Sequence, residues 1–412
     1  MKKNSIVTAI DIGSTKVCCF IAHIGDRDNF KILGIGHCLC LGVKSGIIID
    51  MESVEKSVAQ AVESAEKMAN FRARSAYVSI SGKNVESKIA SMTLTLGGRI
   101  VTKDDLLYLF GQCSKEIDPN REIIHSIPVL YSVDSLNGIK DPLGMFANQL
   151  TVNINLVTVA KPQLHNILVC LGRCHLDVIG IVAAGYAAGL GVIDEADMPE
   201  NQIVIDFGGG IISMAFFYNG IFCGSDVVPM GGKNITSDIA YGLNVSIANA
   251  ERLKTLHGAA FTAMTDNRDM IFAPVIEDND IINLQQIPKS ALNQIIQPRI
   301  EEIFMAVRKK INDSAFGSDF SRSVIITGGG SLMTGLRDFA SGILNKKVKF
   351  KKMDDFLDGS DVQIGNNFSV VLGIIKFAQL NDYNFAKTKS LAKNGEKIGF
   401  LKKILNWIEN NL

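Results

Sequence analysis

The 412-residue chain has no excess of charge of either sign, because 42 Lys and Arg residues balance 42 Asp and Glu residues. Nucleic-acid binding depends on a basic excess that attracts phosphates, so this balance argues against nucleic acid as a partner. The lysine-rich run at 346–352 does not change this, because its alternation predicts an edge strand with outward lysines. Hydrophobic residues make up 47% of the chain, which excludes disorder over most of its length.

Metal-binding and disulfide patterns are also missing. The eight cysteines include no C-x-x-C pair, and the six histidines show no H-x-x-H spacing. These absences argue against a structural zinc site and a disulfide scaffold, and they favour a reducing, cytosolic compartment. The longest uncharged run, between Asp206 and Asp226, contains a glycine triplet and a Tyr-Asn-Gly turn. It therefore predicts strands and a turn, not a membrane-spanning helix.

Two segments far apart in the chain repeat one pattern. Residues 5–10 predict a strand, 11–15 a polar turn, and 16–24 a second strand. Residues 203–210 again give a strand, an aspartate and a glycine turn, and 211–228 predict two more strands. A repeat of this kind favours two similar α/β domains that face each other, with a ligand between them.

A third glycine-rich turn follows another buried strand. Ser323–Thr327 predicts the strand, and Gly328–Ser331 leads into a helix expected to start near Met333. Glycines let the backbone approach a ligand closely, and a helix N-terminus favours negative charge. Three glycine-rich turns, each directly after an apolar strand, together predict a bound nucleotide.

These turns resemble the nucleotide site of the actin/Hsp70/sugar-kinase superfamily. The resemblance makes residues 11–16 the first phosphate loop, 206–210 the second and 328–331 the adenosine loop. Glu251-Arg252-Leu253-Lys254 is similar to the superfamily's Glu-x-x-Lys helix beside adenine and ribose. ATP and Mg²⁺ are the implied cofactors.

Two aspartates on opposing hairpins, Asp11 and Asp206, are expected to hold a hydrated Mg²⁺ through its waters, because Mg²⁺ takes few direct protein ligands. Lys16 offers a point charge to the phosphates. The predicted nucleotide-binding residues are Gly13, Ser14, Thr15, Lys16, Gly208, Gly209, Gly210, Gly231, Gly232, Glu251, Lys254, Gly329, Gly330 and Ser331.

Further motifs narrow the resemblance to the FtsA family of bacterial cell-division proteins. They are Arg121–Pro128, Gly138–Met145, Gly231–Ala240 and the closing tail. The resemblance implies an actin-like α/β fold, in which two duplicated α/β domains surround a nucleotide cleft. It adds an inserted FtsA-type subdomain and a C-terminal amphipathic helix.

The resemblance also implies subdomain limits. They are 1–83 and 161–195 for subdomain 1A, with helix 367–380 packed on it, 84–160 for subdomain 1C, 196–228 and 303–360 for subdomain 2A, 229–302 for subdomain 2B, 381–397 for a linker, and 398–412 for a membrane-targeting helix.

One departure from the superfamily pattern concerns hydrolysis. The second phosphate loop usually continues from three glycines to a hydroxyl residue and, two positions further on, to an aspartate. Ile211 and Ser213 occupy these places. The missing hydroxyl and carboxylate could have bonded a phosphate oxygen and oriented a water molecule. No catalytic residue is assigned, and hydrolysis is expected to be weak or absent.

The end of the chain predicts an amphipathic helix after the polar linker. At 100° per residue, its apolar side chains share one half of the helical wheel, together with the chain's single tryptophan, which suits a membrane interface. A helix docked on the protein's own core is the alternative. The predicted membrane residues are Phe400, Leu401, Lys402, Lys403, Ile404, Leu405, Trp407 and Ile408.

Residues 297–303 resemble the family helix that faces the C-terminal tail of FtsZ, a tubulin-like division protein. Pro298 predicts the first turn of a helix, and Arg299 and Glu302 are expected to be exposed one turn apart. The alternative is an ordinary surface ion pair, which contributes little by itself.

The resemblance therefore implies an ATP-binding, polymerising protein that anchors FtsZ to the cytoplasmic face of the inner membrane at the division site. The implied partners are the FtsZ tail, further copies of the chain, later division proteins and an anionic membrane surface. A sugar or metabolite kinase of the same superfamily is the alternative, and it needs a catalytic carboxylate in the cleft. An Hsp70-like chaperone needs a β-sandwich domain after residue 380, where only a short tail follows.

Overall fold

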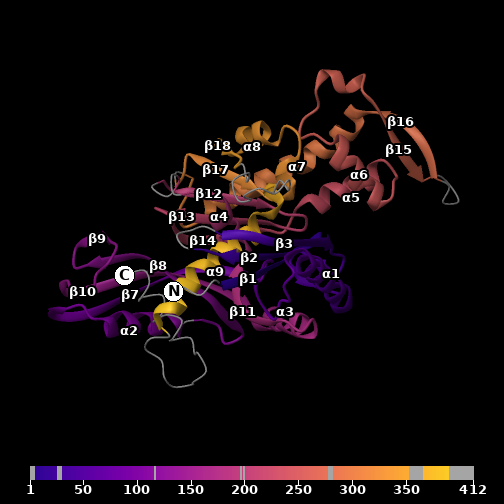
Figure 1. Ribbon diagram of the computed structural model, residues 1–412. Helices are drawn as coiled ribbons and strands as arrows, with labels where there is room; N and C mark the ends of the chain where they lie inside the picture. The colour runs from indigo at the N-terminus through magenta and orange to yellow at the C-terminus, as the bar shows by residue number, and fades with distance from the viewer. Residues whose placement is uncertain are drawn as a thin grey trace.

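The structure is a computed structural model (Figure 1). It describes residues 5–25, 30–115, 117–194, 197, 200–276, 282–318, 320–351 and 365–388.

The first half of the molecule is built on a five-stranded sheet in the order β11-β6-β1-β2-β3. The strands β1, β2 and β3 pair antiparallel, whereas β6 and β11 join the sheet in parallel. The strand β2 is a nearly continuous apolar run, and it lies inside the sheet with both of its faces buried. The bounds are β1 Ser5–Ile12, β2 Lys16–Ile24, β3 Phe30–Leu39, β6 Ser75–Ile80 and β11 Asp177–Ala183.

The second half repeats this topology in the order β14-β13-β12-β17-β18. Again the first three strands in the chain are antiparallel and the last two are parallel. The predicted internal repeat therefore extends to a whole sheet. The bounds are β12 Gln202–Phe207, β13 Ile212–Tyr218, β14 Ile221–Val228, β17 Ser323–Thr327 and β18 Lys347–Lys349. As expected, β18 lies at the sheet edge, with Lys347 exposed and Val348 buried.

Helices cover both sheets and join them. In Figure 1, α9, drawn in yellow, passes between the two sheets beside α4. One apolar cluster contains side chains of β1, α4, β13 and α9, so the two halves share a core. The helices of this part are α1 Met51–Ala69, α3 Lys161–Arg173, α4 Ala184–Val192, α8 Leu336–Leu344 and α9 Ser369–Thr388, with the short strands β4 Val43–Lys44 and β5 Ile47–Ile48.

A separate antiparallel sheet in the order β7-β10-β8-β9 is inserted into the first half. It has its own apolar cluster beneath α2. His125 of β8 joins it to the body, because its Nε2 accepts a hydrogen bond from the Ala183 amide at 3.0 Å. The bounds are β7 Val85–Ile100, α2 Lys103–Ser114, β8 Arg121–Val133, β9 Leu136–Ile139 and β10 Phe146–Ala160.

The second half carries an insertion of its own between β14 and β17, at the upper right of Figure 1. Its elements are α5 Gly232–Gly242, α6 Ile247–His257, the 3-10 helix η2 Met264–Asn267, β15 Met270–Ile276, β16 Ile282–Pro288 and α7 Lys289–Asp313. Two further 3-10 helices, η4 Gly329–Leu332 and η6 Asn366–Phe368, precede α8 and α9. Among the helices of the described ranges, none is both long enough and apolar enough to cross a membrane.

Three sequence predictions of helix bounds are wrong. Pro298 does not begin a helix, because α7 starts at Lys289 and contains it. A proline inside a helix costs about 3 kcal/mol. However, Leu292, Ile296 and Ile300 are buried on one face of α7, and each such burial contributes about 1.5–3 kcal/mol. Burial of the apolar face therefore keeps α7 helical on both sides of Pro298.

The other two errors concern α8 and α9. The helix after the third glycine turn begins at Leu336, not near Met333, because Gly335 adopts a left-handed backbone with φ of 75° that interrupts it. Residues 381–388, predicted as linker, continue α9, since they contain no glycine or proline that would end it. The rest of the predicted linker and the tail helix at 398–412 lie outside the described residues.

Candidate nucleotide site

A cavity of about 590 Å³ lies where the two halves meet. Three turns line it: residues 11–16 between β1 and β2, residues 206–211 between β12 and β13, and residues 328–330 after β17. The first two turns occupy equivalent places in the repeated sheets, so Asp11 and Asp206 both line the cavity, each from its own half of the molecule. The fold thus brings together the three glycine-rich turns that are far apart in the sequence.

Every residue predicted to bind nucleotide or magnesium lines this cavity, except Gly231 and Ser331. The Gly231 amide donates to Asn234 Oδ1 at 2.9 Å, and the buried Ser331 hydroxyl donates to the Gly328 carbonyl at 2.7 Å. These two residues hold the backbone of their loops in place. Both residues are direct neighbours of cavity-lining glycines, Gly232 and Gly330, and their contact with a nucleotide stays a prediction.

The two carboxylates are unusual in their titration. Burial and, to a smaller extent, the nearby charge of Asp11 together raise the pKa of Asp206 to about 7, against the opposing charge of Lys16. Burial also raises the pKa of Asp11, although a 2.6 Å hydrogen bond from the Ser79 hydroxyl stabilises its ionised form. A divalent cation between them would relieve this cost.

The donor set fits one kind of cation. Within the described ranges, no group of three or more His, Cys, Asp or Glu side chains is placed to hold a metal ion directly. Two carboxylates at an otherwise glycine-rich cavity suit Mg²⁺, which keeps most of its waters and is completed by phosphate oxygens.

Lys16 lies at the cavity wall and contacts η6, directly before α9. Its Nζ donates to the Asn367 carbonyl at 2.7 Å and lies 3.9 Å from the centroid of the Phe368 ring. Asn367 and Phe368 therefore hold the Lys16 side chain in place. No sequence pattern indicated Asn367, which is 351 positions away from Lys16.

Glu251 and Lys254 form a network at one end of the cavity. Lys254 Nζ donates to Glu251 Oε2 at 2.6 Å and to Thr236 Oγ1 at 2.8 Å. Thr236 belongs to the Gly231–Ala240 motif but was not predicted as a site residue. Lys289, at the start of α7, and His257, at the end of α6, also line the cavity, and no sequence signal indicated them.

Ile211 and Ser213 both line the cavity. Ser213 pairs directly with Asp206 across the β12–β13 ladder. Beside Asp206, the cavity wall therefore contains a serine and an isoleucine.

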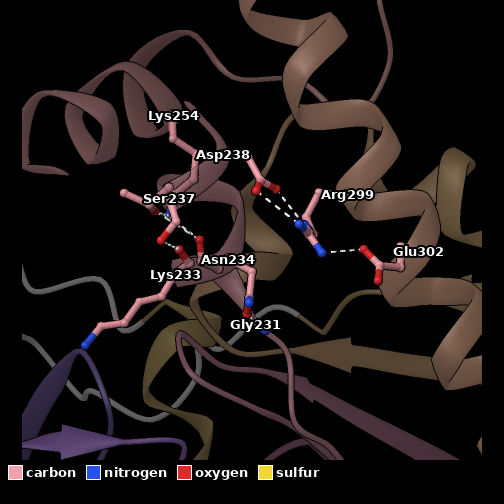
Figure 2. Close-up of polar contacts among 10 residues, drawn as sticks. Gly231, Lys233, Asn234, Ser237, Asp238, Lys254, Arg299 and Glu302 are labelled. Carbon is pink, nitrogen blue, oxygen red and sulfur yellow. Dashed lines mark hydrogen bonds and ion pairs between the residues drawn. The ribbon is translucent and has the colours of Figure 1, made fainter. Parts of the chain in front are cut away.

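Arg299 and Glu302 lie on α7 outside the cavity (Figure 2). Arg299 forms a two-pronged ion pair with Asp238 of α5, with Nε–Oδ2 and Nη2–Oδ1 distances of 2.5 and 3.0 Å. It also donates to Glu302. The side chain of Arg299 is 28% exposed and that of Glu302 is 55% exposed. Asp238, 61 positions away in the sequence, was not predicted to hold Arg299.

The repeated sheets around one cavity define a class of protein, the actin-like ATPase fold. The PilM–PilN type IV pilus biogenesis complex matches with a TM-score of 0.65 and 14% identity, over 90% of this chain and 98% of that chain. MreB5 of Spiroplasma citri bound to AMPPNP matches with a TM-score of 0.58 and 12% identity, over 94% and 99% of the two chains. At these identities the likeness shows the fold alone.

Sequence comparison gives the particular family. A family model described as "Cell division protein FtsA" matches residues 203–373, and one described as "SHS2 domain inserted in FTSA" matches residues 82–158. "Cell division protein FtsA" of Rhizobium meliloti (strain 1021) is 34% identical over 392 residues, which cover 92% of this chain and 89% of that protein. The chain belongs to the FtsA family and is an actin-like cell-division protein.

Proposed function

We propose that this protein binds ATP with Mg²⁺ in the cavity, polymerises, and anchors FtsZ to the cytoplasmic face of the inner membrane at the division site. In this role it also recruits later division proteins. One observation carries the proposal. Two Asp–Gly turns, one from each of the two repeated sheets, line the same cavity together with a third glycine-rich loop. The AMPPNP named with the structure of MreB5 supports a nucleotide as the ligand of this fold.

Each part of the cavity has a role in this proposal. Asp11 and Asp206 hold the waters of Mg²⁺, and the amides of Gly208–Gly210 bind the phosphates. Lys16 adds a point charge once the phosphates draw it from the Asn367 carbonyl. The other end of the cavity, with Glu251, Lys254, Gly329 and Gly330, encloses the nucleoside.

Magnesium nucleotide binding should depend on pH through Asp206, and this tests the proposal. The pKa of Asp206 is raised to about 7, so at lower pH its carboxyl group carries a proton that must leave before Mg²⁺ is held. Calorimetry should show affinity falling by up to about tenfold per pH unit below 7 and levelling off above it. Asp206→Asn, which cannot titrate, should bind more weakly and with a flatter profile. A wild-type profile no steeper than that of the variant would refute the assignment.

Hydrolysis should be very slow or undetectable, because Ile211 and Ser213 offer no carboxylate to orient water. Phosphate release by purified protein measures this, under conditions where ATP is bound. Restoring both groups in the double variant I211T/S213D should raise the rate at least tenfold. Rapid phosphate release by the wild type would mean that another residue positions the water.

Arg299 and Glu302 should bind the C-terminal tail of FtsZ. Reversing both charges is a poor test, because it would set a carboxylate against Asp238 and disturb α5. Arg299→Gln and Glu302→Gln avoid this, and each should weaken binding about tenfold, the typical contribution of a hydrogen bond to a charged group. Anisotropy with a labelled FtsZ tail peptide gives the affinity.

Arg308→Gln is the matched control for these variants, since Arg308 is an exposed arginine on the same helix. It should bind like the wild type. If Arg299→Gln also binds like the wild type, Arg299 and Glu302 form only a surface ion pair. The relatives favour the division role over the sugar-kinase alternative, because they are FtsA proteins that match along most of this chain.

A further inference from the structure

The two phosphate loops belong to different halves of the molecule, yet they touch. A Cβ atom added to Gly209 would lie 2.2 Å from Thr15 Cγ2, and one added to Gly210 would lie 2.5 Å from Ser14 Oγ. No side chain therefore fits between the loops at these points. Because phosphates would be enclosed between the two loops, contacts that hold the loops together also retain a bound nucleotide.

Lys233, near the start of α5, contacts both loops at once. Its backbone N–H donates to the Gly209 carbonyl of the second loop at 2.7 Å. Its Nζ donates to the Ser14 carbonyl of the first loop. Figure 2 shows the side chain extending away from α5 toward the first half of the molecule, drawn in indigo and purple. The nearby bond from Ser45 Oγ to the Gly210 carbonyl is longer, at 3.4 Å.

The position of this lysine has no local explanation. Lys233 is the second residue of α5, and the partial positive charge of a helix N-terminus disfavours a cation there. The residue is exposed and does not line the cavity. The contact with Ser14 is therefore the interaction that accounts for a lysine at this place.

We propose that Lys233 is a positioning residue that holds the first phosphate loop against the second and slows the release of a bound nucleoside triphosphate. The inference rests on the proposed function, because it takes the cavity to hold ATP. A bond from an ammonium group to a carbonyl is charge-assisted and stronger than a neutral one. It has to break before the loops separate, so its loss acts on nucleotide dissociation more than on association.

The test uses the full chain, Mg²⁺ and a fluorescent ATP analogue that is chased by excess ATP in a stopped-flow instrument. Lys233→Met keeps the apolar stem but loses the ammonium group, and its dissociation rate should rise about tenfold. Its association rate should change less than about twofold. Lys233→Arg should restore most of the wild-type rate. Lys67→Met, which removes an exposed lysine of α1, should behave like the wild type.

Hydrogen exchange in the nucleotide-free protein gives a second readout. Amides of residues 12–16 should exchange faster in Lys233→Met than in the wild type or in Lys67→Met. Wild-type dissociation kinetics in Lys233→Met would overturn the inference, whatever the exchange shows. If the wild type binds no nucleotide, the proposed function fails. The hydrogen-exchange rates of residues 12–16 then decide whether Lys233 holds the first loop in place.

Discussion

Replacing Gly329 by valine is expected to abolish ATP binding while the fold persists. Gly329 lines the cavity, and a Cβ atom at this position would meet no protein atom within 4 Å. The new side chain would occupy space that the nucleoside needs. Calorimetry should therefore show affinity reduced about 100-fold or more, which corresponds to a loss of roughly 3 kcal/mol.

The neighbouring glycines show why Gly329 is the right position for this test. A Cβ atom at Gly330 would lie 2.5 Å from the Phe207 ring, so valine there would disturb the core as well as the site. Gly342→Val is the matched control, because Gly342 is exposed on α8 and also has no atom within 4 Å of an added Cβ. Wild-type ATP affinity in Gly329→Val would show that the nucleotide site is wrongly assigned.

Replacing Trp407 by glutamate is expected to release the protein from membranes. The predicted helix at 398–412 is too short to span a bilayer core of ~30 Å at ~1.5 Å per residue, so we propose that it lies in the interface. A carboxylate on its apolar half would have to enter the acyl region. Sedimentation with anionic liposomes should fall from most of the protein to near background, with ATP binding unchanged.

A control on the opposite side of the helix separates charge from position. Asn406→Glu makes the same change of charge on the polar half and should still sediment with liposomes. Lys402 and Lys403 should each contribute about 1 kcal/mol near an anionic surface, and salt should weaken this part of the binding. If Trp407→Glu sediments like the wild type, with self-assembly suppressed, the helix docks on the protein itself.

The glycine turns of the site could be predicted from the sequence because their signals are local. An apolar strand followed by Asp and Gly, as at Asp11 and Asp206, is visible within a few residues. The second copy then indicated that the two turns face each other, and the repeated sheet order accounts for this. The duplicated fold was predictable for the same reason.

Other features depend on contacts between distant segments. Asn367 reaches Lys16, and Asp238 reaches Arg299, only after whole helices have packed. No local pattern marks such pairs. Pro298 was misplaced because proline favours the first turn of a helix, whereas burial of the apolar face of α7 outweighs that preference.

The most direct test of the central claim is recruitment of FtsZ to liposomes by the full chain with Mg²⁺ and ATP. FtsZ should sediment with anionic liposomes only when this protein is present, and FtsZ without its C-terminal tail should stay in the supernatant. Arg299→Gln should reduce the FtsZ in the pellet without reducing its own binding to liposomes. FtsZ that remains in the supernatant while the wild-type protein is on the liposomes would contradict the proposed role.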